Sequence, residues 1–258
     1  MNFDFATRID RRQHATKKWL QYDEDVLPLW VADMDFRSPP AIISALESRV
    51  AHGVFGYGDV SATLKQTLCD WSRDHYDWQI EKAWQLWVPG VVPALNLAAM
   101  AFSEPGQGVL TATPIYPPFL SVARNTGREA QTFALAEPVA PGEPWRLDLE
   151  ALEAAIQPNT RVLLWCHPHN PTGRVWNAEE MKGLAELAVR HDLIVVSDEL
   201  HCDLILDPSV SHRPLGQLCP ELKDRLITLW APSKTFNIAG LSSACAIIAD
   251  DDLRQRFQ

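Results

Sequence analysis

The sequence lacks the features that mark several classes of protein. It has no run of lysine or arginine long enough to bind a phosphate backbone, and 33 acidic side chains outnumber 23 basic ones, for a formal net charge of -10. A nucleic-acid partner is therefore not expected. The apolar stretches, such as residues 109–113 and 193–196, are much shorter than the ~20 residues of a membrane-spanning helix. The N-terminus has no apolar signal-peptide segment, so we expect a cytoplasmic protein with no membrane partner.

The cysteines and histidines do not form a disulfide framework or a metal-binding pattern. The five cysteines include no C-x-x-C pair, and an odd number in a chain without a secretion signal favours reduced thiols. His167 and His169 form an H-x-H string, but no third ligand lies near them in the sequence. We therefore predict no metal site.

The chain does contain an alternation of short apolar runs with helical segments. Pro40 suits the first turn of a helix that ends near Gly53, and Asn177 with Glu180 forms a capping box at the start of another helix. A further helix is expected over residues 62–75, and strands are expected at 109–113, 161–166, 193–198, 226–230 and 244–249. This alternation predicts an α/β fold in which helices pack on both faces of a mainly parallel sheet.

Chemically useful side chains follow the predicted strands. Ligands of open α/β sheets bind beyond the carboxyl ends of the strands, and Tyr116, Asn170, Asp198 and Lys234 lie at or just after such ends. These four groups suit pyridoxal 5'-phosphate (PLP). An aromatic ring can stack on the cofactor ring, and an amide can hydrogen-bond its phenolate oxygen. A carboxylate can keep the ring nitrogen protonated, and an amine can form an imine with the aldehyde. Asp198 ends a nearly apolar strand and requires a cationic partner, whereas Glu199 is expected to be structural.

The phosphate of such a cofactor requires its own binding site. Gly90 allows a close approach of the backbone, and Pro93 suits the first turn of the apolar helix that follows. The free N–H groups of Val91 and Val92 at the start of that helix are expected to attract an anion.

Several strings together identify a family. HNPTG (169–173), SDELH (197–201) and SKTFNIAG (233–240), in this order and with TPIYPPF (113–119), resemble the class I/II aminotransferase family of PLP-dependent enzymes. VADMDF (31–36) and HGVFGYG (52–58) resemble its cystathionine β-lyase/PatB-like carbon–sulfur lyase branch. The resemblance implies the PLP-dependent transferase fold (aspartate aminotransferase fold type I) and a homodimer.

The resemblance also implies a role for each matching residue. Lys234 would be the Schiff-base lysine, Asp198 the partner of the pyridinium nitrogen and Tyr116 the stacking ring, and these three would be the catalytic residues. Asn170 and His201 would bind the phenolate oxygen of the cofactor.

The phosphate-binding residues follow in the same way. Ser233, Gly90 and the backbone of Val91 and Val92 would bind the phosphate within one subunit. Tyr57 would reach the phosphate held by the neighbouring subunit.

The resemblance further implies a division into domains. Residues 1–45 would form an N-terminal arm and part of a small domain, and residues 46–258 would form the large PLP-binding domain. Family members continue beyond this point to complete a C-terminal small domain, which supplies the arginine for the substrate carboxylate. We expect that domain to be incomplete here.

The activity implied is that of a PLP-dependent carbon–sulfur β-lyase. Its substrate would be cystathionine or another S-substituted cysteine, and its products a thiol, pyruvate and ammonia. A PLP-dependent aminotransferase of class I/II is the alternative, because both reactions use the same lysine. A third hypothesis is a regulatory protein that binds a transcription activator, a role known among proteins that this branch resembles.

Overall fold

The computed structural model describes residues 3–14 and 16–258, so residues 1, 2 and 15 of the predicted arm lie outside it. The chain divides into two compact units. The first comprises Met1–Asp59 with Pro232–Ser242, and the second comprises Val60–Ala231 with Ser243–Gln258. This division differs from the predicted boundary between residues 45 and 46, which falls inside a continuous helix, α2 (Pro40–His52).

The first unit contains one long helix and several helical turns. Pro40 occupies the first turn of α2, and Gly53 ends the helix with a φ of 72°, a left-handed conformation that glycine adopts without strain, as predicted. The shorter helices are η1 (Arg12–His14), α1 (Lys17–Leu20) and η4 (Ala239–Leu241).

The second unit is built on one sheet. In the described residues its strands are β1 (Gln85–Val88), β2 (Gly108–Thr113), β3 (Glu129–Ala134), β4 (Thr160–Cys166), β5 (Ile194–Asp198), β6 (Leu226–Trp230) and β7 (Ala244–Ile247), in the order β1-β7-β6-β5-β4-β2-β3. Strands β3, β2, β4, β5 and β6 are parallel, and β7 is antiparallel to both of its neighbours, β6 and β1. The prediction of a mainly parallel sheet is confirmed.

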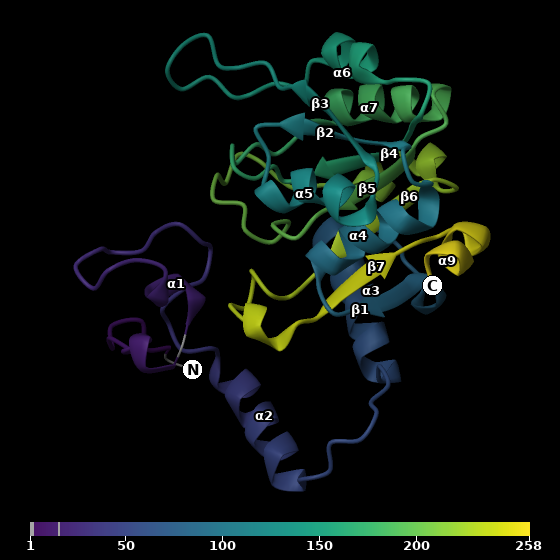
Figure 1. The fold of residues 1–258 in the computed structure, drawn as a ribbon. Coiled ribbons are helices and arrows are strands. Elements are labelled where there is room, and N and C mark those ends of the chain that lie inside the picture. Colours follow the sequence, from purple (N-terminus) through teal and green to yellow (C-terminus); the bar gives the residue numbers. More distant parts are fainter. Residues whose placement is uncertain (1–2, 15) are drawn as a thin grey trace. The chain divides into compact units, whose positions relative to one another are not determined.

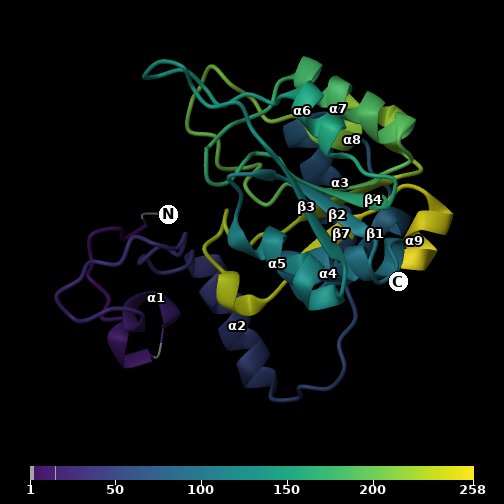
Figure 2. The same ribbon diagram turned by 45° about the horizontal axis from the view of Figure 1, so that its top comes forward.

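Helices cover both faces of this sheet, as Figures 1 and 2 show. One apolar cluster joins a face of the sheet to α4 (Val91–Phe102), α5 (Pro117–Thr126) and α9 (Asp251–Phe257). The cluster on the other face joins it to α6 (Leu149–Ala155), α7 (Ala178–Arg190) and α8 (Leu215–Leu218), and α3 (Ala62–Tyr76) packs farther along. Each fully buried leucine or phenylalanine contributes roughly 1.5–3 kcal/mol to folding.

The amphipathic helix α7 shows how local sequence sets an element. The Asn177 side chain accepts a hydrogen bond from the Glu180 N–H, and the Glu180 carboxylate accepts one from the Asn177 N–H, so the predicted capping box is formed. Glu180 also pairs with Arg174 at 2.8 Å. The cap thereby ties the loop after β4 to the helix that follows it.

No helix in the described part of the chain is long and apolar enough to cross a bilayer.

Candidate functional site

The loops after β2 and β4 meet at the carboxyl edge of the sheet. Asn170 lies in the loop that follows β4, and its carbonyl oxygen accepts a hydrogen bond from the Tyr116 N–H at 3.2 Å. Gly173, with a φ of 71°, closes that loop by donating its N–H to the His169 carbonyl at 2.8 Å. The structure thus brings together two of the residues predicted to contact a cofactor ring.

Asp198 ends β5 at the same edge. Asp198 is only 6% exposed to solvent. Its Cα is in register with Cys166 of β4 and with Leu229 of β6. The carbonyl of Asp198 accepts a hydrogen bond from the His167 N–H at 2.9 Å, which ties it to the loop that carries Asn170. Its Oδ1 accepts one from the Leu200 N–H at 3.0 Å. The predicted burial of this carboxylate is therefore observed.

The thiol of Cys166 reports the electrostatics around Asp198. Burial, and then the negative charge of Asp198, raise the pKa of Cys166 well above its usual range. Cys166 Sγ instead accepts a hydrogen bond from the Asn170 N–H at 3.3 Å. The carboxylate therefore makes its surroundings unfavourable for a second anion and favourable for a cation.

A cavity of about 560 Å³ opens beside this edge. Its walls are the loops after β4 and β5 together with Trp145 and its neighbours in the segment after β3, and Asn170 and His201 both line it. That volume is within the range of small-molecule sites in proteins. Asn170 and His201, which were predicted to bind the same cofactor oxygen, therefore border one cavity.

The start of α4 has the geometry expected of an anion site. Gly90 precedes the helix with a φ of 149°, a backbone conformation that L-residues rarely adopt. The N–H groups of Val91 and Val92 lie in the first turn, where no intrahelical acceptor exists for them. Because β1 leads into this turn, the helix begins at the same end of the sheet as Asp198.

Lys234, Ser233 and Tyr57 belong to the first unit. Lys234 Nζ donates a hydrogen bond to the Ala32 carbonyl at 2.9 Å. The loop that carries Lys234 is thus attached to the VADMDF segment (31–36). The two segments are more than 190 residues apart in the sequence. The approach of Lys234 to Asp198 stays a prediction.

Asn237 holds the same attachment. Its side chain accepts from the Met34 N–H at 3.0 Å and donates to the carbonyls of Met34 at 3.0 Å and Phe36 at 3.2 Å. No role was predicted for Asn237 from the sequence. The residue type was a clue, because asparagine tolerates the left-handed backbone conformation. Asn237 adopts that conformation here, with a φ of 53°.

A buried polar network lies directly behind Asp198. Glu199 is fully buried and accepts hydrogen bonds from Ser197 Oγ at 3.0 Å, His212 Nε2 at 3.0 Å, the Leu215 N–H at 2.9 Å and Trp230 Nε1 at 3.3 Å. Burial alone would raise the pKa of Glu199, but the hydrogen bond and charge of His212 hold it below its usual range. Glu199 has the structural role that was expected, and it fixes the chain at the end of β5.

His167 and His169 have separate protein partners. His167 Nε2 donates to the Arg213 carbonyl at 2.9 Å, and His169 Nδ1 lies 2.9 Å from Thr172 Oγ1. Burial lowers the pKa of both rings to about 4, with a further contribution from His212 at His167. Both rings are therefore neutral at pH 7 and pack as structural side chains.

The described side chains fit a phosphorylated pyridine. Asp198 is a buried carboxylate that favours a cation, Tyr116 is 41% exposed and free to cover a ring, and the start of α4 offers backbone donors to a phosphate.

Comparisons with known proteins agree with this geometry. The chain is 40% identical over 263 residues to the cystathionine beta-lyase PatB of Bacillus subtilis (strain 168), a match that covers 100% of this chain and 66% of PatB. The crystal structure of OvoB superposes with a TM-score of 0.93 at 44% identity, over 99% of this chain and 67% of that one. The crystal structure of cystalysin from Treponema denticola, which contains PLP, superposes with a TM-score of 0.92 at 36% identity, over 100% and 66%.

These similarities confirm the predicted fold, that of the PLP-dependent transferases. The chain spans about two thirds of the length of the curated relatives it matches. The model of the family described as "Aminotransferase class I and II" matches residues 24–258. The chain therefore belongs to the class I and II aminotransferase family.

Proposed function

We propose that this chain binds PLP at the carboxyl edge of its sheet and acts as a carbon–sulfur β-lyase on S-substituted cysteines such as cystathionine. The observation that carries the proposal is the assembly of buried Asp198 with Asn170 and Tyr116 at one edge. The choice of reaction is supported by the 40% identity to a protein named as a cystathionine beta-lyase.

Each residue has a defined task in this proposal. Asp198 holds a proton on the ring nitrogen, and the bound cofactor then supplies an electron sink for the substrate's Cα. Asn170 and His201 orient the ring through its phenolate oxygen, and Tyr116 covers one ring face. The N–H groups at the start of α4 hold the phosphate, together with Ser233.

Lys234 would hold the cofactor through Nζ. The same Nζ would act as the general base that removes the proton from the substrate Cα. The electron pair left at Cα expels the β-thiolate, which is a good leaving group. Addition of one water then gives pyruvate and ammonia, so substrate and water balance thiol, pyruvate and ammonia.

The first experiment separates cofactor binding from catalysis. The chain is loaded with PLP, and the visible absorbance band of the lysine imine is compared with that of Lys234→Ala and of Lys223→Ala, a lysine of the second unit. The band is expected in the unaltered chain and in Lys223→Ala and is expected to vanish in Lys234→Ala. A band that survives in Lys234→Ala contradicts the assignment of the lysine.

The second experiment separates the lyase from the alternative. The family description favours an aminotransferase as the second candidate, because that reaction begins with the same proton transfer. Release of thiol and pyruvate from cystathionine without an added keto acid supports the lyase. A strict requirement for a keto acid supports the aminotransferase.

We also propose a homodimer in which Tyr57 reaches the phosphate held by the partner subunit. The Tyr57 side chain is fully exposed and is therefore accessible to another chain. Sedimentation of the PLP-loaded chain is expected to give the mass of a dimer. Tyr57→Phe is expected to weaken PLP retention without removing the imine band, and retention equal to that of the unaltered chain would contradict the role of Tyr57.

A further inference from the structure

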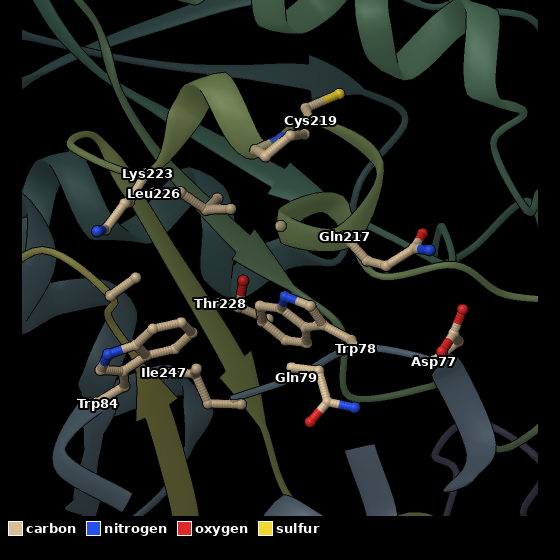
Figure 3. Close-up of a pocket in the computed structure, with 13 residues that line it drawn as sticks. Asp77, Trp78, Gln79, Trp84, Gln217, Cys219, Lys223, Leu226, Thr228 and Ile247 are labelled. Atoms are coloured by element: carbon tan, nitrogen blue, oxygen red, sulfur yellow. The ribbon is translucent and has the colours of Figure 1, made fainter. Parts of the chain in front are cut away.

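A second cavity lies within the second unit and has no role in the proposed reaction. Its volume is about 390 Å³, and it lies over β6 and β7 beside η2 (Lys82–Trp84), α8 and η3 (Pro220–Leu222). The indoles of Trp78 and Trp84 flank Ile247 on one side, and Leu226 lies opposite them (Figure 3). The walls are thus mainly flat aromatic and aliphatic surfaces, which suit a planar apolar ligand.

One polar group borders this apolar space without a partner. Thr228 is fully buried in β6, and its Oγ1 has no hydrogen-bond partner among the described residues. Figure 3 shows the Thr228 hydroxyl between Leu226 and the Trp78 ring. An unpaired buried hydroxyl is costly, by about 1–3 kcal/mol, so it indicates a ligand or water group at this position.

The rim of the cavity supplies a positive charge. Lys223 lines the cavity and forms no ion pair with any described residue. Its amino group lies on the Trp84 side, whereas the Asp77 carboxylate lies beyond Trp78 (Figure 3). An anionic group on a ligand would therefore be attracted to the Lys223 end of the cavity and repelled from the Asp77 end.

The aromatic wall is built to keep its position. A Cβ atom at Gly216 of α8 would lie 2.6 Å from Cζ2 of Trp78, so only glycine permits this approach of the helix to the indole. Trp78 also packs edge-on against Trp230, with ring centroids 5.6 Å apart. The aromatic wall of the cavity is therefore preformed, and a ligand needs only a local shift of side chains to reach the buried hydroxyl of Thr228.

We propose that this cavity is a second binding site, for a small planar aromatic carboxylate that carries a hydrogen-bonding group on its ring. The ring lies between the indoles and Leu226, the ring substituent pairs with Thr228 Oγ1, and the carboxylate faces Lys223.

The cavity lies on the face of the sheet opposite the Asp198 side chain. Thr228 is in register with Ser197, the residue before Asp198. Because strand side chains alternate between faces, Thr228 and Ser197 share the face opposite that of Asp198. Ligand binding here is therefore independent of the Asp198 carboxylate.

The test is a calorimetric titration of the chain with 6-hydroxy-2-naphthoate, in parallel with 2-naphthoate and with 6-hydroxy-2-naphthamide. One saturable site is expected for the hydroxynaphthoate. Loss of the ligand hydroxyl is expected to weaken binding about tenfold, and loss of the ligand charge several-fold.

Three variants locate the site. Thr228→Val, which has the same shape and removes an unpaired polar atom, is expected to fold and to abolish the advantage of the ligand hydroxyl. Lys223→Gln is expected to abolish the advantage of the carboxylate over the amide, whereas Lys17→Gln, a lysine of the first unit, retains it. Asp198→Asn is expected to leave the affinity unchanged, which excludes the active edge as the site measured.

Each opposite result overturns the proposal. Absence of saturation at millimolar ligand shows a cavity filled by water alone. Retention of the hydroxyl advantage in Thr228→Val, or an affinity that falls in Asp198→Asn, places the ligand elsewhere.

Discussion

Oε2 of Glu199 lies 3.0 Å from Nε2 of His212, and neither side chain is exposed to solvent. A buried carboxylate–histidine pair does not guarantee high stability, but the loss of one partner leaves the other groups unpaired. Glu199 is the acceptor for four donors and directly follows Asp198. The network therefore holds the chain at the position where the proposed cofactor site is built.

Replacing Glu199 tests this network. Glu199→Ala is expected to lower the free energy of unfolding by about 3–5 kcal/mol, because buried donors of His212, Leu215 and Trp230 lose their acceptor. The measurement is the denaturant midpoint. Glu153→Gln, at a partly exposed glutamate whose pairs with Arg190 and His191 lie at the surface, serves as the control and is expected to leave the midpoint close to that of the unaltered chain. A small effect of Glu199→Ala would show that water replaces the carboxylate.

The buried histidines predict a dependence of stability on pH. Burial lowers the pKa of His167 and His169 from 6.5 to about 4, so below 6.5 the unfolded chain binds protons that the folded chain does not. Stability is therefore expected to fall as the pH is lowered from about 6.5 to about 4, by up to about 1.4 kcal/mol per pH unit for each ring. Above about pH 6.5 both rings are neutral in both states and contribute no slope.

Denaturant midpoints across this range measure the slope. His167→Gln and His169→Gln are each expected to reduce it. The lowered pKa of Glu199 acts in the same direction at more acidic pH, because its stabilising effect is lost as the pH falls through the pKa of the folded state. A midpoint that does not change between neutral pH and pH 5 would contradict the burial of these rings.

Asn237 gives a prediction for the first unit. Asn237→Ala removes three hydrogen bonds and strains a left-handed backbone, whereas Asn237→Gly removes only the hydrogen bonds. Hydrogen exchange of residues 31–36 is expected to become faster in both variants, and Asn237→Ala is expected to be the less stable by about 1 kcal/mol. Equal exchange in Asn237→Gly and the unaltered chain would show that the side chain does not hold the segment.

Gly90 gives a prediction for the anion site. A Cβ atom at Gly90 would meet only the Pro93 ring, at an ordinary 3.5 Å from Cδ and 3.9 Å from Cγ, so Gly90→Ala strains the backbone φ of 149° without a clash. We expect a loss of about 1–3 kcal/mol of stability and weaker binding of inorganic phosphate. Gly56→Ala, where a Cβ atom would meet nothing within 4 Å, is the control. Phosphate binding unchanged by Gly90→Ala would exclude this turn as the phosphate site.

The sequence predicts the parts of this fold that local patterns determine. The central strands β4, β5 and β6 are almost wholly buried and read as apolar runs, and the caps of α2 and α7 have their own signals. Strands β1 and β3 were not predicted. Both lie at the edges of the sheet, and β3 (EAQTFA) contains no apolar run because most of its residues are exposed.

The contacts that support the site are harder to predict. His212 lies 13 residues beyond Glu199 in a loop with no repeating pattern, and Asn237 contacts residues more than 200 positions away. Such pairs depend on the path of the chain and not on local spacing. The position of Tyr116, Asn170 and Asp198 at one edge could be predicted because ligands of parallel sheets bind at the carboxyl ends of the strands, and their role in binding a cofactor stays a prediction.

Asp198 is the residue on which the proposed reaction depends most. Asp198→Asn keeps the size of the side chain but removes the charge that holds a proton on the cofactor ring, so the electron sink is lost. We expect the rate of thiol release from cystathionine to fall by about two to three orders of magnitude, the equivalent of breaking a buried ion pair of about 3–4 kcal/mol. The imine band formed with Lys234 is expected to remain, because the amine is unchanged. Asp224→Asn, at an exposed aspartate, is expected to leave the rate unchanged. If Asp198→Asn keeps the full rate, the cofactor ring is not the cationic partner of this carboxylate. The role of Asp198 would then be structural, in the loop where it accepts a hydrogen bond from the Leu200 N–H.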